Sequence, residues 1–255
     1  MISIDMNIPE EALVFLEISP MLEVAGSLHM LTQRFVHFLH HPEYVEMIQM
    51  MKHEHLFNEL LYFTPLFVDQ IPLLFTPILT CGIQELEEQF EFVTTLPLRT
   101  FMHSFEQNMR IYKERRPSHT PPIEQDYNDD PELLFHRFIL FLTSYIRLIF
   151  HSTWNNQYPV LTIMQQQLLT HFHSSREHIS HFLLSMFPSA RNGDRIGTIL
   201  LFENRIKGVE LTLNSLHLYI SWYLRHPVYT YRPEAFGQPP LLLMAFPSLM
   251  LRQSY

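Results

Sequence analysis

Histidine has the greatest potential for chemistry in this chain, because 16 of its 255 residues are histidines and neutral imidazole binds transition metals. The best-spaced set is His173, Glu177 and His181, which would share one face of a helix because each follows the last by four residues. Phe172 and Leu183 belong to an apolar stripe on nearly the opposite face, so the set is expected in solvent. The set also spans about 12 Å of helix axis, whereas one zinc ion needs each ligand at about 2.1 Å. We therefore predict no three-ligand metal site here, and an adjacent pair would bind only weakly.

Two other histidine groups have incomplete metal patterns. His37 and His41 are four residues apart, but Pro42 disfavours helical backbone at His41. The segment His53–His55 lacks the two residues that a zinc-protease helix places between its glutamate and its second histidine. The sequence thus predicts no metal and no metal cofactor.

The motifs of common enzymes are missing from the sequence. Its six glycines form neither a GxGxxG nor a GxxxxGK phosphate loop, and there is no GxSxG nucleophile elbow. The carboxylate pairs Glu87–Glu88 and Asp129–Asp130 are sequence neighbours, which do not face each other on a helix. The single cysteine, Cys81, excludes a disulfide within the chain and a cysteine-based zinc site, and its apolar, proline-rich surroundings favour a buried thiol. We expect no catalytic residue, no cofactor and no enzymatic activity.

The charge of the chain argues against direct contact with nucleic acid. Its formal net charge is −9, which on average repels phosphate backbones and anionic lipid. The one basic cluster, residues 110–116 (RIYKERR), is short and is followed by an acidic loop. Cations near the C-terminus of a helix explain this cluster more simply than a nucleic-acid patch does.

Composition indicates a large helical core. Hydrophobic residues make up 47% of the chain and charged residues 17%, and the scarcity of glycine favours helices. The apolar stretches 60–78 and 133–150 are interrupted by prolines or charged residues, so core helices are expected rather than membrane spans. With one cysteine and no signal peptide at its start, the chain is expected in the cytoplasm.

Periodicity predicts helices along most of the chain. Ser19–Pro20 and Asp130–Pro131 each combine an N-cap with a first-turn proline, which is typical of a helix start. Residues 116–130 hold three prolines and are expected to form an exposed loop. Apolar spacings of three to four residues predict helices over about 20–40, 43–63, 83–94, 97–116, 131–150 and 159–187.

Strands are expected near both ends. The first candidate is Ala12–Ile18, a short apolar run. In residues 209–213 and 216–222 apolar and polar residues alternate, and the phase of the alternation reverses at Asn214–Ser215, which predicts two strands separated by a bulge or turn. Leu241–Met244 is a further candidate. The predicted fold is therefore mainly α, a multi-helix single domain over 1–255. A minor β element would come from the N-terminal strand and the C-terminal segments, at about 208–255.

Three short motifs occur in order along the chain. They are Ser19-Pro20-Met21-Leu22-Glu23 with Ser27-Leu28-His29, then Trp154 with Tyr158-Pro159-Val160-Leu161, and finally Leu241–Met244 with Pro247–Ser248. They resemble, in order and spacing, the SPxxE…SL, W…PxL and strand-PS motifs in the N-terminal helical domain of bacterial ArsR-like winged-helix transcriptional regulators. The resemblance covers nearly the whole chain.

This resemblance implies a regulatory domain. In the family a DNA-binding winged helix follows the PS strand, whereas this sequence ends at Tyr255, seven residues after Ser248. We therefore expect a sensor or dimerisation domain that forms a homodimer and reaches DNA only through a winged helix outside this sequence. A core that includes 21 phenylalanines and 13 methionines could adapt to an apolar small-molecule ligand. The alternative is a stand-alone protein that binds a small molecule or a metal.

Overall fold

The chain divides into two compact units, one made of residues 19–158 and the other of residues 1–18 and 159–255. Helices dominate and the strands come from segments near both ends, so the predicted mainly α class with a minor β part is confirmed. A single domain over 1–255 was expected, with a β element from the N-terminal strand and from about 208–255; the unit that contains the strands does include the N-terminus, but it also takes in the chain from Pro159 onward. The computed structural model describes residues 2–5, 14–33, 42–69, 71–72, 74–75, 83–174, 176–186, 190–192, 198–201, 211–213, 216–223, 228–232 and 241–247.

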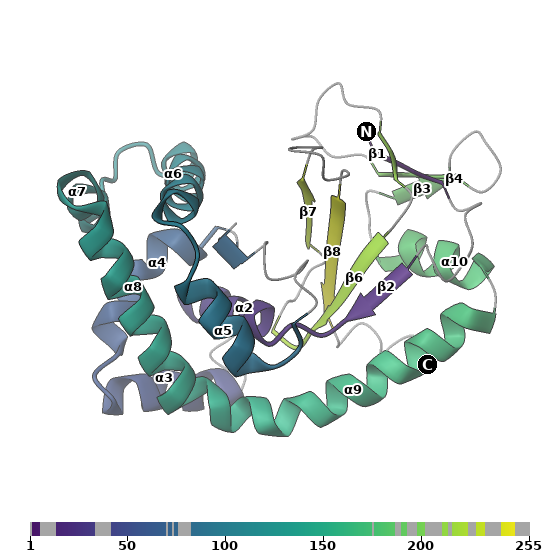
Figure 1. Ribbon diagram of the computed structural model, residues 1–255, viewed down its shortest axis with the longest axis horizontal. Helices are drawn as coiled ribbons and strands as arrows, with labels where there is room; N and C mark the ends of the chain where they lie inside the picture. Colours follow the sequence, from purple (N-terminus) through teal and green to yellow (C-terminus); the bar gives the residue numbers. More distant parts are fainter. Residues whose placement is uncertain are drawn as a thin grey trace. The chain divides into compact units, whose positions relative to one another are not determined.

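The unit 19–158 consists of helices and their connections wherever the structure describes it (Figure 1). Its helices are α2 Pro20–Thr32, α3 Pro42–His53, α4 Phe57–Phe67, α5 Leu86–Thr94, α6 Leu98–Arg115, α7 Pro122–Asp129, α8 Pro131–Tyr145, the π-helical turn η3 Ile146–Phe150, and the first turns of α9 His151–Ser174. Helix α2 packs against α3, α4 and α5, while α8 packs against α6 and α7.

The two predicted helix starts are confirmed. The Ser19 side chain accepts a hydrogen bond from the backbone N–H of Leu22, and Pro20 is the first helical residue of α2. Likewise the Asp130 carboxylate accepts from the N–H of Leu133 at 2.9 Å, with Pro131 at the first position of α8. A cap of this kind contributes about 1 kcal/mol, which is why these two boundaries could be predicted from single residues.

Phenylalanine rings from α4, α6 and α8 form much of the core of this unit. The Phe138 ring of α8 has its centroid 5.3 Å from that of Phe63, 6.2 Å from Phe67 and 5.6 Å from Phe101. Phe63, Phe67 and Phe138 are fully buried. Each such ring contributes about 1.5–3 kcal/mol by burial, and the ring pairs add about 0.5–1.5 kcal/mol each. Helix α8, which was predicted to start after Asp130, is therefore a central helix of this unit.

The helix that starts at Pro131 continues much further than the sequence indicated. After α8 the backbone makes a π-helical turn, in which the N–H of His151 bonds to the carbonyl of Ile146, and then continues as α9. Pro159 was predicted to begin a helix, but it lies inside α9. A proline in a helix interior leaves the carbonyl four residues earlier without its usual donor. Here that residue, Asn155, is exposed, so water can serve instead.

By length and composition alone, the helical stretch Pro131–His173 could cross a membrane. Its best 18-residue window has a mean hydropathy of 1.6, and 50% of that window is buried within the protein. Central helices of globular proteins meet the same criterion. Phe138, Leu142 and Tyr145 of α8 are fully buried, as expected of such a helix.

Four other predicted boundaries were wrong. The helix expected over 20–40 ends at Thr32, and Gln33 after it is extended. The helix expected over 43–63 is divided into α3 and α4 by a turn at Glu54–Leu56. The loop expected over 116–130 contains α7, in which Pro122 occupies a first-turn position and Ile123 is fully buried. The helix expected to reach residue 187 is divided into α9 and α10, the latter spanning Arg176–Met186.

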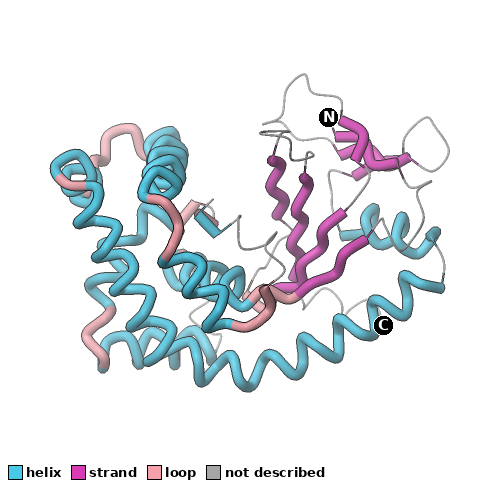
Figure 2. The backbone as a smooth tube through the Cα atoms, in the orientation of Figure 1, coloured by secondary structure: helices cyan, strands magenta, loops and turns pink. Residues whose placement is uncertain are grey.

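In the described part of the second unit there are two four-stranded sheets, whose strands are magenta in Figure 2. One sheet has the order β3 Ala190–Asn192, β4 Thr198–Leu201, β1 Ile2–Asp5 and β5 Leu211–Leu213. The other has the order β2 Val14–Glu17, β6 Leu216–Ser221, β8 Leu241–Pro247 and β7 Val228–Arg232. Strands β2, β6 and β8 are mutually parallel, with Leu16 beside Leu218 and Leu218 beside Met244.

The sequence predicted four of these strands and missed four. Strands β2, β5, β6 and β8 were expected, and they correspond in that order to Ala12–Ile18, 209–213, 216–222 and 241–244. The bulge or turn expected at Asn214–Ser215 lies outside the described residues. Strands β1, β3, β4 and β7 were not expected, because three of them have only three or four residues and give little alternation to detect.

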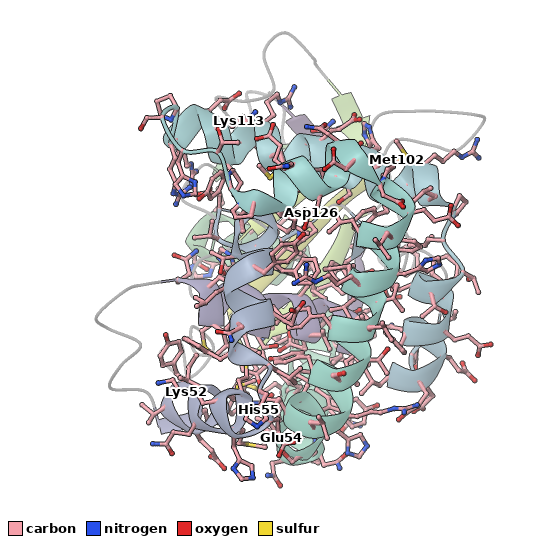
Figure 3. All side chains as sticks on the ribbon, turned by 90° about the vertical axis from the view of Figure 1, so that its left-hand side faces the viewer. Lys52, Glu54, His55, Met102, Lys113 and Asp126 are labelled. Atoms are coloured by element: carbon pink, nitrogen blue, oxygen red, sulfur yellow. The ribbon has the colours of Figure 1, made fainter. Side chains whose placement is uncertain are left out.

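Helix α3 ends in a Schellman motif with a histidine where glycine is usual. The N–H of Leu56 bonds to the carbonyl of Met51 at 2.8 Å, and the N–H of His55 bonds to that of Lys52 at 3.3 Å. This arrangement requires a left-handed backbone at His55, whose φ is 59°. His55 is exposed near the lower edge of the view in Figure 3. A side chain with a Cβ is strained in this conformation by about 1 kcal/mol.

The substitution His55→Gly should therefore stabilise the protein by about 0.5–1 kcal/mol, despite the greater freedom that glycine gives the unfolded chain. Urea denaturation of the wild type and the variant measures this difference. The matched control is His53→Gly, which changes the same residue type within the last turn of α3. It should destabilise by about 0.5–1 kcal/mol, because glycine is unfavourable in a helix. Equal losses at both positions would contradict the strain assigned to His55.

Candidate functional site

The first of the three sequence motifs forms helix α2, which is buried almost all round. Twelve of its 13 residues are buried, His29 being the exception. At its start, the Gln89 side-chain oxygen accepts hydrogen bonds from the Ser19 hydroxyl and the Met21 N–H, both at 3.0 Å. The Gln89 side-chain nitrogen donates to the carbonyl of Ile83 at 2.7 Å. This glutamine, from α5, therefore ties the capped end of α2 to a second segment of the unit.

In the middle of α2, Ser27 forms a buried hydroxyl pair with Tyr145 of α8. The two oxygens are 2.7 Å apart, and both residues are fully buried. The Ser27 hydroxyl also donates to the carbonyl of Val24 at 2.7 Å, so the proton between the two hydroxyls comes from Tyr145. Burial raises the pKa of Tyr145 above its ordinary value, which keeps this phenol neutral. One turn before Ser27, Glu23 of the same motif is also fully buried.

The end of α2 contributes to a group of side chains that we call the carbonyl clamp, because they bind the last carbonyls of α4. The His29 Nδ1 lies 2.5 Å from the carbonyl of Phe67. The Gln33 amide nitrogen donates to the carbonyl of Val68 at 2.7 Å and lies 3.1 Å from His29 Nε2. The Asn108 amide of α6 donates to the carbonyl of Leu66. The clamp supplies donors to carbonyls that the helix itself leaves unsatisfied.

The protonation state of His29 follows from this geometry. Its Nδ1 must carry a proton to donate to Phe67, and its Nε2 then accepts from Gln33. Burial lowers the pKa of His29, and this effect outweighs the hydrogen bond to Phe67 and the attraction of Asp69, which both raise it. The imidazole is therefore held neutral in one tautomer.

The basic cluster at residues 110–116 is largely occupied by ion pairs within the unit. Arg115 and Arg116 bond the two oxygens of the Asp69 carboxylate at 2.8 and 2.5 Å, and the Asp69 side chain is only 5% exposed. Lys113, labelled near the top of Figure 3, bonds to Glu124 of α7. A helix end with cations near its C-terminus was expected, but not these ion pairs, because Asp69 is 46 residues before Arg115 in the sequence.

Sequence reasoning missed a second polar group, which joins α4, α7 and α8 at the surface. Arg137 donates two hydrogen bonds to the Glu59 carboxylate, at 2.9 and 2.8 Å, and its guanidinium lies 3.7 Å from the centre of the Tyr62 ring. The Tyr62 hydroxyl donates to Asp126, which is labelled in Figure 3. Burial and the Asp126 carboxylate raise the pKa of Tyr62. Arg137 is thus an anchor between helices.

The second and third motifs lie in helix α9 and strand β8. Trp154 lies in the first turns of α9, where its ring is 5.8 Å from Phe150 and 5.1 Å from Tyr158. Leu241–Met244 forms the start of β8, and Pro247 ends it. Ser248 lies outside the described residues.

The predicted histidine set is not brought together by one continuous helix. His173 lies near the end of α9 and His181 in α10, and both are exposed. The Glu177 side chain, together with His37, His41 and Cys81, lies outside what the structure describes. His53 and Glu54 are exposed neighbours 3.8 Å apart. Across the described residues, no group of three His, Cys, Asp or Glu side chains could hold a metal ion.

Comparison with protein-family models, with curated proteins and with solved structures finds no match to this chain. The buried polar groups of α2 and the carbonyl clamp are therefore interpreted from their own chemistry.

The Ser27–Tyr145 pair should respond unequally to removal of its two members. Ser27→Ala leaves the Tyr145 hydroxyl buried without an acceptor and should cost about 2 kcal/mol of unfolding free energy. Tyr145→Phe leaves Ser27 bonded to Val24 and should cost about 1 kcal/mol. The double variant should lose less than the sum of the single losses, because the orphaned hydroxyl is gone. Urea denaturation of all four proteins tests this, and strictly additive losses would show that the pair is not coupled.

His29 should make stability depend on pH. Its folded pKa is below the ordinary value of about 6.5, so the unfolded chain binds the proton more readily. Its contribution to stability is complete above about pH 6.5 and is lost as the pH falls through the folded pKa. His29→Asn, which keeps a donor for Phe67, should flatten the slope of stability with pH in that window by up to about 1.4 kcal/mol per pH unit. The control is His53→Asn at an exposed position, which should keep the wild-type dependence of stability on pH. If His29→Asn also keeps the wild-type dependence, His29 is not its source.

Proposed function

We propose that residues 1–255 are the regulatory part of a bacterial transcriptional regulator and act in the cytoplasm in ligand sensing and self-association. The observation that supports this most is the position of the first motif. Its residues Ser19, Ser27 and His29 all bond to other elements of the unit. The motif that resembles one of ArsR-like regulators therefore lies in the buried centre of the unit.

A sensing role needs an element whose position a ligand can bias. Helix α4 is suited to this, because its last carbonyls are held by the side chains of the carbonyl clamp and its Phe63 and Phe67 lie in the aromatic core. An apolar small molecule that enters this core would displace the phenylalanine rings of α4. The resulting shift of α4 would change the hydrogen bonds that its last carbonyls accept from His29 and Gln33. The ligand class proposed is therefore an apolar or aromatic molecule.

The charges of the chain argue that DNA contact belongs to another domain. The net charge of −9 opposes a phosphate backbone, whose neutralisation supplies most non-specific affinity. Within the basic cluster, Arg115, Arg116 and Lys113 are engaged by Asp69 and Glu124. Contact with phosphates through these residues would first require those ion pairs to break.

Residues 1–255 should therefore self-associate without binding duplex DNA specifically. Light scattering should give a mass near twice the chain mass of 30.5 kDa, because symmetric operators are read by dimers. A shift assay at moderate salt with the DNA upstream of the gene should show no complex that resists competitor DNA. Salt-resistant, sequence-specific binding would overturn the division of roles, and a strictly monomeric chain would remove self-association and leave sensing alone.

A further inference from the structure

Helix α8 and the π-helical turn after it expose a stripe of three leucines. Leu133, Leu140 and Leu148 are 65%, 67% and 47% exposed, although the opposite side of the same helix is buried. Leu140 comes seven residues after Leu133, which is about two turns. Leu148 comes eight residues after Leu140, one more than two α-helical turns contain. The π-helical turn between them has more residues per turn than an α-helix, so Leu148 lies in line with Leu133 and Leu140. Three exposed leucines in line form an apolar strip, which differs from isolated surface leucines.

The charges beside this leucine stripe are arranged for pairing with a second copy. Glu132 directly precedes Leu133, and Arg147 directly precedes Leu148, so both lie on the same flank of the helix. Both are exposed. If two copies of the helix lie antiparallel with Leu140 at the twofold axis, Leu133 and Leu148 are each about 10 Å from that axis. The symmetry then places Leu133 against the partner's Leu148, and Glu132 against the partner's Arg147.

A parallel pair would give a different result. Its twofold axis would run along the helices, so Glu132 and its copy would lie at the same height but on opposite sides of the contact, and Glu132 would not meet the partner's Arg147. The pairing of Glu132 with the partner's Arg147 therefore requires the antiparallel arrangement. The occupant that matches both the apolar stripe and its flanking charges is another copy of this chain.

We propose that the leucine stripe of α8 and η3 is the homodimer interface, with Leu140 packed on its symmetry mate. This inference rests on the self-association in the proposed function and specifies where it occurs. A membrane surface would also cover exposed leucines, but it would not require Glu132 and Arg147 to carry opposite charges at matched positions along the helix. Lipid is therefore the competing outcome of the test.

The test measures the dimer dissociation constant of the full chain by analytical ultracentrifugation. Leu140→Glu places two carboxylates at the twofold axis and should weaken the dimer at least tenfold. The matched control is Ile163→Glu, a 56% exposed residue of the other unit, which should leave the constant unchanged. Glu132→Arg and Arg147→Glu should each weaken the dimer several-fold. The double variant Glu132→Arg/Arg147→Glu should restore it, because the pair is re-formed with its charges exchanged.

Each outcome separates this inference from the proposed function. A wild-type dimer that Leu140→Glu leaves intact, with its circular dichroism unchanged, overturns the interface but not self-association. A wild-type chain that is monomeric throughout overturns both. A monomer that binds phosphatidylcholine vesicles, and loses that binding in Leu140→Glu, assigns the stripe to lipid and overturns the proposal. Failure of the charge-exchanged double variant to recover overturns the antiparallel arrangement.

Discussion

The burial of helix α2 is the constraint on which the helical unit depends. A helix that is buried all round must find a partner for each of its polar side chains inside the protein, since an unsatisfied one costs about 1–3 kcal/mol. Ser19 finds Gln89, Ser27 finds Tyr145, and His29 finds the carbonyl of Phe67. These partners belong to three different segments. The positions of α4, α5 and α8 around α2 are thus fixed by hydrogen bonds as well as by apolar packing.

The parts of the fold that could be predicted are those determined by neighbouring residues. A capping side chain followed by proline was sufficient to locate the starts of α2 and α8. The turn at His55 could not be predicted, because the residue usually found at a left-handed position is glycine. Helix α7 was missed because prolines suggested a loop, whereas Pro122 takes a first-turn position in which proline is tolerated.

The candidate site was harder to predict than the fold, because its bonds join residues that are far apart in the sequence. Arg137 and Glu59 are separated by 78 residues, and Ser27 and Tyr145 by 118. A single sequence contains no signal for such pairs. The spacing of the histidines led to His173 and His181, for which no metal site was predicted, whereas among the described histidines His29 is the one whose hydrogen bonds and burial fix its protonation state; it was part of the first motif but was given no role.

The phenols of this unit also set an alkaline limit to its stability. The pKa values of Tyr62 and Tyr145 are raised, and burial with the Glu106 carboxylate raises that of Tyr127 to about 12. Once unfolded, all three would ionise near pH 10. Their contribution is therefore complete below that pH and declines above it, since only the unfolded chain readily releases the protons. The ultraviolet absorbance of these three tyrosinates, out of the 11 tyrosines of the chain, would consequently appear together with unfolding, so this part of the signal reports the opening of the unit at high pH.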